Sequence, residues 1–430
     1  MSATRRLRER VTAAIGRSAL VTVDQALVSG SNLLVTVLLV RTLGLAEFGR
    51  FSLWWMAVVF AQSLQQACIG TPMLTIGPKE ERRDGAEYYA AVARLEVAFL
   101  ALVAVLGGAL ALPLASATGL HLEGWGELAA LLAVAVARNA HDFLRQSGFA
   151  RGRKAWVLAL DALAYGGQLV LLLALAASDG LTTTTALCAL AASSAFGVAF
   201  GAATFGAFRA APGAVARALR RHARMSRWLA ALSVAQWFTS NAYAAAAGVV
   251  LGPAAVAVLK AGQTILGVLH VLMLAVENVV PVRAAGIAAR GAWDELDRYL
   301  ARLARLGGAA TVAVSALVAL CAAPLSRWVY GFESAEQTLV IRGFALLYPC
   351  LFAIALLGIR LRTHERTRPI FVAQLLGASV SLVAASSMVE VFGLIGALTG
   401  IVLQQVLVLL VLLYAQPSSS RASVGTAQVT

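Results

Sequence analysis

Residues 19–70 read ALVTVDQALVSGSNLLVTVLLVRTLGLAEFGRFSLWWMAVVFAQSLQQACIG, and this stretch decides the fold. It contains two apolar segments, 19–40 and 51–70, each with the ~20 residues that a helix needs to cross ~30 Å of hydrocarbon. The join between them carries Gly44 and Gly49, and glycines suit a tight reversal between two helices. The stretch therefore predicts a helical hairpin in a membrane.

A related phrase, VLGPAAVA, recurs at residues 250–257 and also joins two apolar segments. Each copy follows a polar patch, at residues 30–32 in the first and 239–241 in the second. Weak internal similarity of this kind is typical of transporters built from two related halves. It falls where a duplicated second half would begin.

Composition also places the chain in a membrane. Of its 430 residues, 60% are hydrophobic and 13% are charged, and the mean hydropathy is +0.79. A soluble protein of this length needs far more charge on its surface. The sequence has no phosphate-binding loop, no His-Glu-x-x-His motif, no paired cysteines and no segment that could house a glycosyltransferase. It therefore predicts no enzyme, no metal and no cofactor.

Twelve apolar segments are long enough to cross the bilayer as helices. They are residues 19–40, 51–70, 89–112, 127–147, 156–177, 184–207, 228–249, 254–280, 307–326, 338–359, 369–389 and 392–414. This pattern predicts an all-α membrane protein with about twelve transmembrane helices in two six-helix lobes.

The order of these segments divides the chain into five regions. They are a basic cytoplasmic N-terminus at 1–18, an N-terminal lobe at 19–207, a cytoplasmic amphipathic linker at 208–227, a C-terminal lobe at 228–414 and a disordered Ser-rich tail at 415–430. Because each lobe has an even number of spans, both lobes enter the membrane from the same side.

The basic residues are distributed asymmetrically between the two sides of the membrane. With the N-terminus inside, 28 of the 35 Lys and Arg residues lie in cytoplasmic segments and four lie outside. Such a bias predicts that both termini are cytoplasmic, in the cytoplasmic (inner) membrane of a bacterium. The net charge of +14 then faces anionic lipid head groups, so it does not imply nucleic acid as a partner.

One cytoplasmic connection, residues 289–305, is strongly amphipathic. Trp293, Leu296, Leu300 and Leu303 share one helical face, and charged residues occupy the other. This pattern predicts a helix that lies flat on the membrane surface.

The hairpin motif, Leu43-Gly44 followed by Phe48-Gly49-Arg50-Phe51 and an aromatic-rich helix, resembles the multidrug/oligosaccharidyl-lipid/polysaccharide exporter superfamily. Within that superfamily it resembles the polysaccharide-transport branch, to which O-antigen flippases belong. The twelve-span pattern extends the resemblance over nearly the whole chain. The resemblance implies two lobes around a central cavity, alternating access and a lipid-linked glycan as substrate.

Span four carries a polar stripe. Arg138, His141, Asp142 and Arg145 are spaced i, i+3, i+4 and i+7, so they share one helical face. Charges inside a span usually face a cavity or a partner, and the stripe therefore predicts a water-filled interior that binds substrate. The alternative is a structural Arg138–Asp142 ion pair.

A second candidate group lies in spans seven and eight. Lys260, two turns into span eight, either binds the substrate or extends its amine to the membrane surface. Gln236 and Asn241 belong to a neutral polar patch in span seven that either binds sugars or forms hydrogen bonds between helices.

Three acidic residues are candidates for ion coupling: Asp24, Asp161 and Asp142. Some drug-exporting relatives use a carboxylate of the first helix in this way, and Asp24 matches that residue type. Its alternative role is to pair with a nearby arginine. Arg94 and Glu96, near the inner end of span three, are expected either to extend to the membrane surface or to form a structural ion pair.

The functional hypothesis is a flippase or exporter of lipid-linked oligosaccharide or polysaccharide precursors. Its partners are a polyprenyl-diphosphate glycan, membrane lipids and possible polysaccharide-assembly proteins. The main alternative is a multidrug/cation antiporter on the same scaffold, which needs carboxylates in its cavity. The candidate cations Arg138, Arg145 and Lys260 favour an anionic substrate.

The charge bias makes a testable prediction about topology. Reporter proteins fused after residue 120 and after residue 218 are expected to read outside and inside, respectively, because basic segments stay in the cytoplasm. Alkaline phosphatase and green fluorescent protein fusions measure this. The reverse pattern would contradict both the orientation and the span count.

Overall fold

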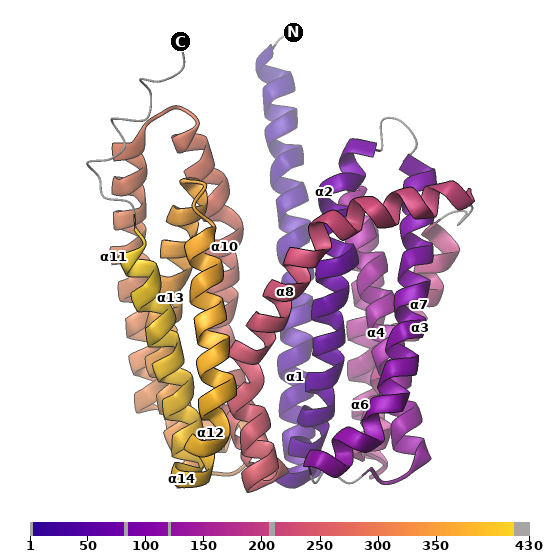
Figure 1. Cartoon of the computed structure of the whole chain (residues 1–430), viewed down its shortest axis with the longest axis vertical. Helices are drawn as coiled ribbons and strands as arrows, with labels where there is room; N and C mark the ends of the chain where they lie inside the picture. The colour runs from indigo at the N-terminus through magenta and orange to yellow at the C-terminus, as the bar shows by residue number, and fades with distance from the viewer. Residues whose placement is uncertain (1–2, 81–84, 119–121, 206–210, 417–430) are drawn as a thin grey trace. The chain divides into compact units, whose positions relative to one another are not determined.

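The computed structural model describes residues 3–80, 85–118, 122–205 and 211–416, and these residues form helices and no strand (Figure 1). The chain divides into two compact units. The first comprises residues 1–234 and 252–257, and the second comprises 235–251 and 258–430. The all-α fold class is thus confirmed. The predicted tail from 417 onward lies outside the described residues.

The first unit consists of long helices interrupted by two short π-helical turns. Its elements are α1 (Ala3–Gln65), η1 (Gln66–Gly70), α2 (Thr71–Glu80), α3 (Gly85–Thr118), α4 (Trp125–Ala150), α5 (Lys154–Asp161), η2 (Ala162–Gly166), α6 (Gly167–Ala177), α7 (Thr183–Phe205) and the beginning of α8 (Pro212–Leu251).

The second unit takes the end of α8 and the remaining helices. They are α9 (Pro253–Ile265), which begins in the first unit, α10 (Gly267–Ala288), α11 (Trp293–Leu320), α12 (Ala322–Tyr330), α13 (Ala335–Thr363) and α14 (Arg368–Tyr414).

Three glycines at positive φ reverse the chain between consecutive spans. Gly44 interrupts α1 with φ 75° and ψ 175°, and Gly393 interrupts α14 with φ 60° and ψ −139°. Gly252 separates α8 from α9 with φ 91° and ψ 172°, which is close to the conformation of Gly44. Residues with a Cβ rarely adopt these values, so glycine is required at each reversal. The two related sequence phrases therefore fold into the same kind of turn.

Gly49, the second glycine of the hairpin motif, has a different role. A Cβ at this position would lie 1.8 Å from the carbonyl oxygen of Pro253, which also belongs to the first unit. The backbone of the first phrase therefore contacts the backbone of the second. Only a glycine permits such a close approach.

Seven helical stretches of the described residues are long and apolar enough to cross a membrane. Two of them, α1 with α2 and α14, contain the reversals at Gly44 and Gly393 and thus supply two passages each. Helices α4 and α8 and the α9–α10 pair lie at the positions of the other predicted spans. Within the described ranges, helices therefore cover all twelve predicted spans. The ninth differs, because α11 ends at Leu320 and a break at Cys321 precedes α12.

The described part of the predicted linker, from residue 211, continues into span seven as the single helix α8. Its apolar face packs on the first unit through Ala214 and Ala218. Two polar contacts anchor the same face. Ser226 Oγ donates to the carbonyl oxygen of Cys68 at 2.9 Å, and the His222 ring lies 2.9 Å from the Tyr88 hydroxyl. Burial lowers the pKa of the His222 imidazole, so the neutral ring is favoured in this contact.

The prediction of a separate surface helix at residues 289–305 is wrong. Helix α11 runs without interruption from Trp293 to Leu320. The apolar face packs on protein, since Leu296 is fully buried against Phe352 and Ile359, both in α13. Trp293 stacks on His364 with ring centroids 4.6 Å apart. An amphipathic pattern gives the position of the apolar face but does not distinguish a lipid surface from a neighbouring helix.

This packing predicts that Leu296→Ala destabilises the protein by about 2–5 kcal/mol, because it leaves a cavity between α11 and α13. The matched control is Leu306→Ala on the same helix, where the side chain is 67% exposed and no cavity forms. Thermal unfolding in detergent measures both. Equal midpoints for the two variants would contradict the packing described here.

Candidate functional site

Helix α4 positions the polar stripe inside the first unit. Arg138 and His141 are buried, and Asp142 and Arg145 are partly buried. Helices α1, α5 and α7 and the π-helical turn η2 all pack on or near α4. Small residues allow this, because a Cβ on Gly197 of α7 would lie 2.8 Å from the His141 ring. The stripe therefore faces protein and not lipid.

Arg145 joins two carboxylates from two other elements. Its Nη2 lies 2.8 Å from Asp24 Oδ2 of α1, and its Nε lies 2.6 Å from Asp161 Oδ2 of α5. Both carboxylates are almost inaccessible to solvent. The alternative role of Asp24, pairing with an arginine, is confirmed. His141 extends the cluster, since its Nε2 lies 3.3 Å from Asp161 Oδ1.

Arg138 has a different environment. Its guanidinium lies over the ring of Tyr165, 4.3 Å from the centroid, and 5.9 Å from that of Trp55. The side chain is 4% exposed, and its Nη1 has no hydrogen-bond partner. Among the described residues no carboxylate lies within 4.0 Å of it, so the alternative Arg138–Asp142 pair is not formed. Asp142 instead accepts a hydrogen bond from Gln146 Nε2 at 3.2 Å.

A second polar chain in the same unit was not predicted from the sequence. Gln65 Nε2 donates to Glu96 Oε2 at 3.3 Å, and Gln146 Nε2 donates to Gln65 Oε1 at 3.4 Å. Gln146 also contacts Asp142, so the chain links α3 to the stripe of α4. Its signal in the sequence is a polar residue within each of the apolar spans two, three and four, namely Gln65, Glu96 and Gln146. Helical periodicity alone does not reveal which helices meet.

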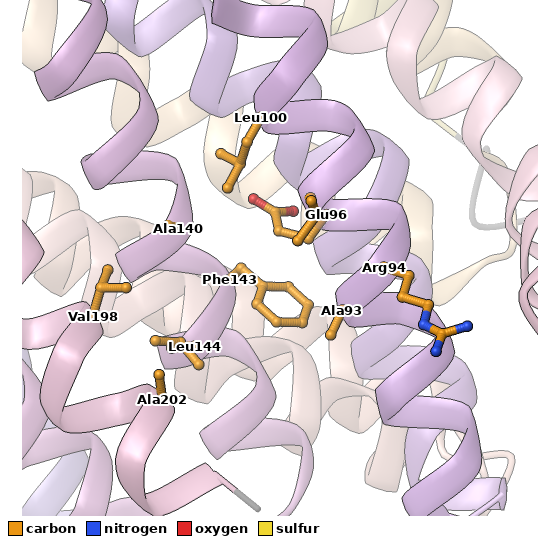
Figure 2. Close-up of a pocket in the computed structure, with 10 residues that line it drawn as sticks. Ala93, Arg94, Glu96, Leu100, Ala140, Phe143, Leu144, Val198 and Ala202 are labelled. Atoms are coloured by element: carbon orange, nitrogen blue, oxygen red, sulfur yellow. The ribbon is translucent and has the colours of Figure 1, made fainter. Parts of the chain in front are cut away.

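Of the two alternatives for Arg94 and Glu96, the structure does not form the ion pair. Figure 2 shows the Arg94 guanidinium pointing away from the Glu96 carboxylate, which turns toward a cavity between α3 and α4. Arg94 is exposed, whereas Glu96 is buried. Residues two apart on a helix do not face each other, which is the physical reason.

The remaining candidate residues belong to the second unit. Lys260 Nζ donates to Asn241 Oδ1 at 3.1 Å, so the structure brings these two predicted residues together. Gln236 is exposed and makes no side-chain hydrogen bond within the described parts of the chain. In the same polar patch, the Thr239 hydroxyl forms a hydrogen bond between helices, because its Oγ1 donates to the carbonyl oxygen of Gln374 at 3.4 Å.

The candidate residues thus supply cations, carboxylates and amides. Within the described ranges no three His, Cys, Asp or Glu side chains come together as metal ligands do. Arg145 is neutralised by its two carboxylates. Arg138 and Lys260 each lack a carboxylate within 4.0 Å in the part of the chain that the structure describes. The first unit thus holds one such cation, Arg138, and the second unit holds another, Lys260.

No protein-family model and no curated protein matches the chain. Solved structures do. An inward-facing multidrug resistance MATE family transporter of the MOP superfamily matches with a TM-score of 0.72 at 14% identity, covering 91% of this chain and 93% of that one. The lipid II flippase MurJ in an inward closed conformation matches with a TM-score of 0.69 at 10% identity, covering 93% and 87%.

A MOP superfamily transporter from Pyrococcus furiosus, described as having a binding pocket of reverse polarity, matches with a TM-score of 0.63. The identity is 15%, and the match covers 93% of this chain and 94% of that one. At these identities the likeness shows the fold, which is the fold of MOP superfamily transporters. The resemblance seen in the hairpin motif is supported at that level.

The cluster around Arg145 predicts a large effect of removing its guanidinium. Arg145→Ala leaves Asp24 and Asp161 buried without a cation and is expected to destabilise the protein by about 3–5 kcal/mol. The triple variant Asp24→Asn/Arg145→Met/Asp161→Asn removes all three charges and is expected to recover most of this loss. Thermal unfolding in detergent compares the two. An unchanged midpoint for Arg145→Ala would contradict the structural role of the cluster.

Proposed function

We propose that the chain is a transporter that moves lipid-linked oligosaccharide or polysaccharide precursors across a bacterial cytoplasmic membrane by alternating access. Two observations support the transport step. The fold is similar to that of MOP superfamily transporters, and the chain has helices long and apolar enough to cross a membrane. The likeness to MurJ, which is named as a lipid II flippase, supports a lipid-linked glycan as the cargo. The substrate crosses without any covalent change, so the protein is not an enzyme.

The observation that carries the proposal is the environment of Arg138. A buried guanidinium without a carboxylate is costly in a membrane-spanning helix unless another group compensates it. Tyr165 supplies part of that compensation through its ring face. The unpartnered Nη1 leaves one donor direction free, and the oxygens of a phosphate form strong charge-assisted hydrogen bonds with a guanidinium.

Lys260 gives a second cation of the same kind in the other unit. Its amine contacts the neutral oxygen of Asn241, and this contact holds the amine in place without neutralising it. A polyprenyl diphosphate carries its negative charge next to the sugar, so amide groups beside a cation suit its head group. The apolar tail of such a lipid stays in the bilayer. The proposed binding residues are therefore Arg138, Lys260 and Asn241, with Arg145 and His141 as supports of the Arg138 face.

Arg138 is covered in this conformation, so its proposed role includes a movement. Tyr165 and Trp55 lie over the guanidinium, and either side chain must turn aside before a diphosphate can reach it. The backbone of Tyr165 is fixed by a separate contact, because Ser31 Oγ donates a hydrogen bond to its carbonyl oxygen at 2.9 Å. A covered binding cation suits alternating access, in which the site is open at one stage of the cycle and closed at another.

A cation antiporter is the second candidate, and one observation favours it. Asp24, Asp161 and Asp142 outnumber the arginines Arg138 and Arg145 around α4. Two of these carboxylates are buried and already bound to Arg145, which leaves Asp142 as the carboxylate open to a cationic drug. Asp24 and Asp161 are engaged by Arg145, so they are not free to bind a bulky cation.

Mutation of Arg138 tests the proposal in proteoliposomes loaded with a fluorescent polyprenyl-diphosphate sugar. Arg138→Ala is expected to reduce its transport at least about tenfold, the factor that corresponds to losing one charge-assisted hydrogen bond. Arg138→Lys keeps the charge but loses the guanidinium fork, so partial activity is expected. Arg94→Ala, which removes an exposed arginine from α3, is the matched control and should leave transport unchanged.

The double variant Arg138→Ala/Asp142→Ala separates binding from structural pairing. If Arg138 binds the substrate, removing Asp142 does not restore transport. Restored transport in the double variant would contradict the anion site. Uptake of a lipophilic cation by the wild-type protein, with no movement of the labelled glycolipid, would favour the antiporter instead.

A further inference from the structure

A cavity of about 260 Å³ lies between α3, α4 and α7 of the first unit (Figure 2). Its walls are almost entirely apolar, with Val97, Phe143, Leu144 and Val198 among them. Glu96 is the one acidic side chain that lines it. A carboxyl group in such surroundings is costly to ionise, because little around it replaces the water that would solvate the charge.

Glu96 has one weak partner. Its side chain is 2% exposed, its Oε2 accepts from Gln65 Nε2 at 3.3 Å, and its Oε1 has no hydrogen-bond partner. In the part of the chain that the structure describes, no basic nitrogen lies within 4.0 Å of either oxygen. The charge of a Glu96 carboxylate would therefore be uncompensated.

Glu127 of α4 is buried as deeply as Glu96 but has a basic side chain near its carboxyl group. It is also 2% exposed, and it belongs to the same unit. Its Oε1 lies 3.6 Å from Arg50 Nε, and its Oε2 accepts a hydrogen bond from the backbone N–H of Glu123 at 2.7 Å. The two glutamates thus differ in their partners and not in their depth. Glu127 has a guanidinium nitrogen within 4.0 Å, whereas Glu96 has no basic nitrogen within that distance in the described ranges.

Among the described residues that line the cavity, Arg94 is the one basic side chain, and its guanidinium points away from the Glu96 carboxylate (Figure 2). Gln65 of α1 is neutral, and the lining residues from α7, Val198 and Ala202, are apolar. Helix α4 contributes Asp142, a second carboxyl group, which reaches the network through Gln146.

The network around Glu96 contains more hydrogen-bond acceptors than donors. Glu96 Oε1, Gln146 Oε1 and Asn139 Oδ1 are all buried acceptors without a donor among the described residues. One proton on Glu96 gives the network an additional O–H. If the Gln65 amide then turns over, its oxygen accepts from Glu96 and its nitrogen faces Gln146. Protonation of Glu96 would thereby rearrange the contacts that link α3 to α4.

We propose that Glu96 is a proton-binding site. Binding of a proton to its carboxyl group changes the hydrogen bonds that run from Glu96 through Gln65 and Gln146 to Asp142. The chemistry is reversible transfer of one proton between a carboxylic acid and water. This site is separate from the Arg145 cluster, and it gives a transporter a means of linking its conformation to proton uptake. It does not depend on which substrate is carried.

Infrared spectroscopy of the full chain in lipid nanodiscs tests the site directly. Spectra of the wild type and of Glu96→Gln are recorded above about pH 5, where exposed glutamates are ionised. The carbonyl band of a protonated carboxylic acid is expected in the wild type and lost in Glu96→Gln. Glu127→Gln is the matched control and is expected to keep the band. A difference spectrum without this band would overturn the proposal.

A second measurement needs no variant and so covers the case in which Glu96→Gln does not fold. A hydrophobic carbodiimide reacts with protonated carboxyl groups in apolar surroundings, and peptide mass spectrometry locates the product. The wild-type protein is expected to be modified at Glu96 and not at Glu127, with less modification as pH rises. Modification at Glu127 in place of Glu96 would overturn the proposal. Neither measurement requires transport, so a failure of the proposed substrate would leave this test intact.

Discussion

A charge inside a membrane-spanning helix must be compensated by protein, and Arg145 does this for two carboxylates at once. Its guanidinium holds Asp24 of α1 and Asp161 of α5 against α4, so a single side chain ties three elements together. Each unpaired ion would cost several kcal/mol in such surroundings. The geometry around the cluster follows from that constraint, because His141 and Tyr165 fill the remaining space beside it.

The spans were predictable from the sequence because they depend on local composition. A helix across hydrocarbon needs ~20 apolar residues in succession, and that requirement applies without knowledge of any neighbour. The reversals were predictable for a similar reason. Gly44 and Gly252 stand between apolar segments in related phrases, and both adopt nearly the same positive-φ conformation. Backbone conformation at a turn is a property of the residue itself.

The side-chain partners were not predictable, because they come from distant parts of the chain. Arg145 meets Asp24 from 121 residues away, and Gln65 meets Glu96 from 31 residues away. Sequence spacing suggested the local pairs Arg138–Asp142 and Arg94–Glu96, and the structure forms neither. The prediction of a surface helix at residues 289–305 was wrong for a related reason. Its apolar face covers α13, and the sequence does not state which apolar surface a helix will meet.

The two units differ in the chemistry of their buried side chains. Among the described residues, the buried carboxyl groups Asp24, Glu96, Glu127 and Asp161 all belong to the first unit. The second unit joins its helices through neutral contacts, such as Tyr330 Oη donating to the carbonyl oxygen of Ala261, and it holds Lys260 against an amide. Buried carboxyl groups are thus concentrated in the first unit, and the proposed proton site at Glu96 is one of them. The two cations that have no carboxylate within 4.0 Å among the described residues, Arg138 and Lys260, are instead divided between the units, because neither unit buries a carboxyl group beside them.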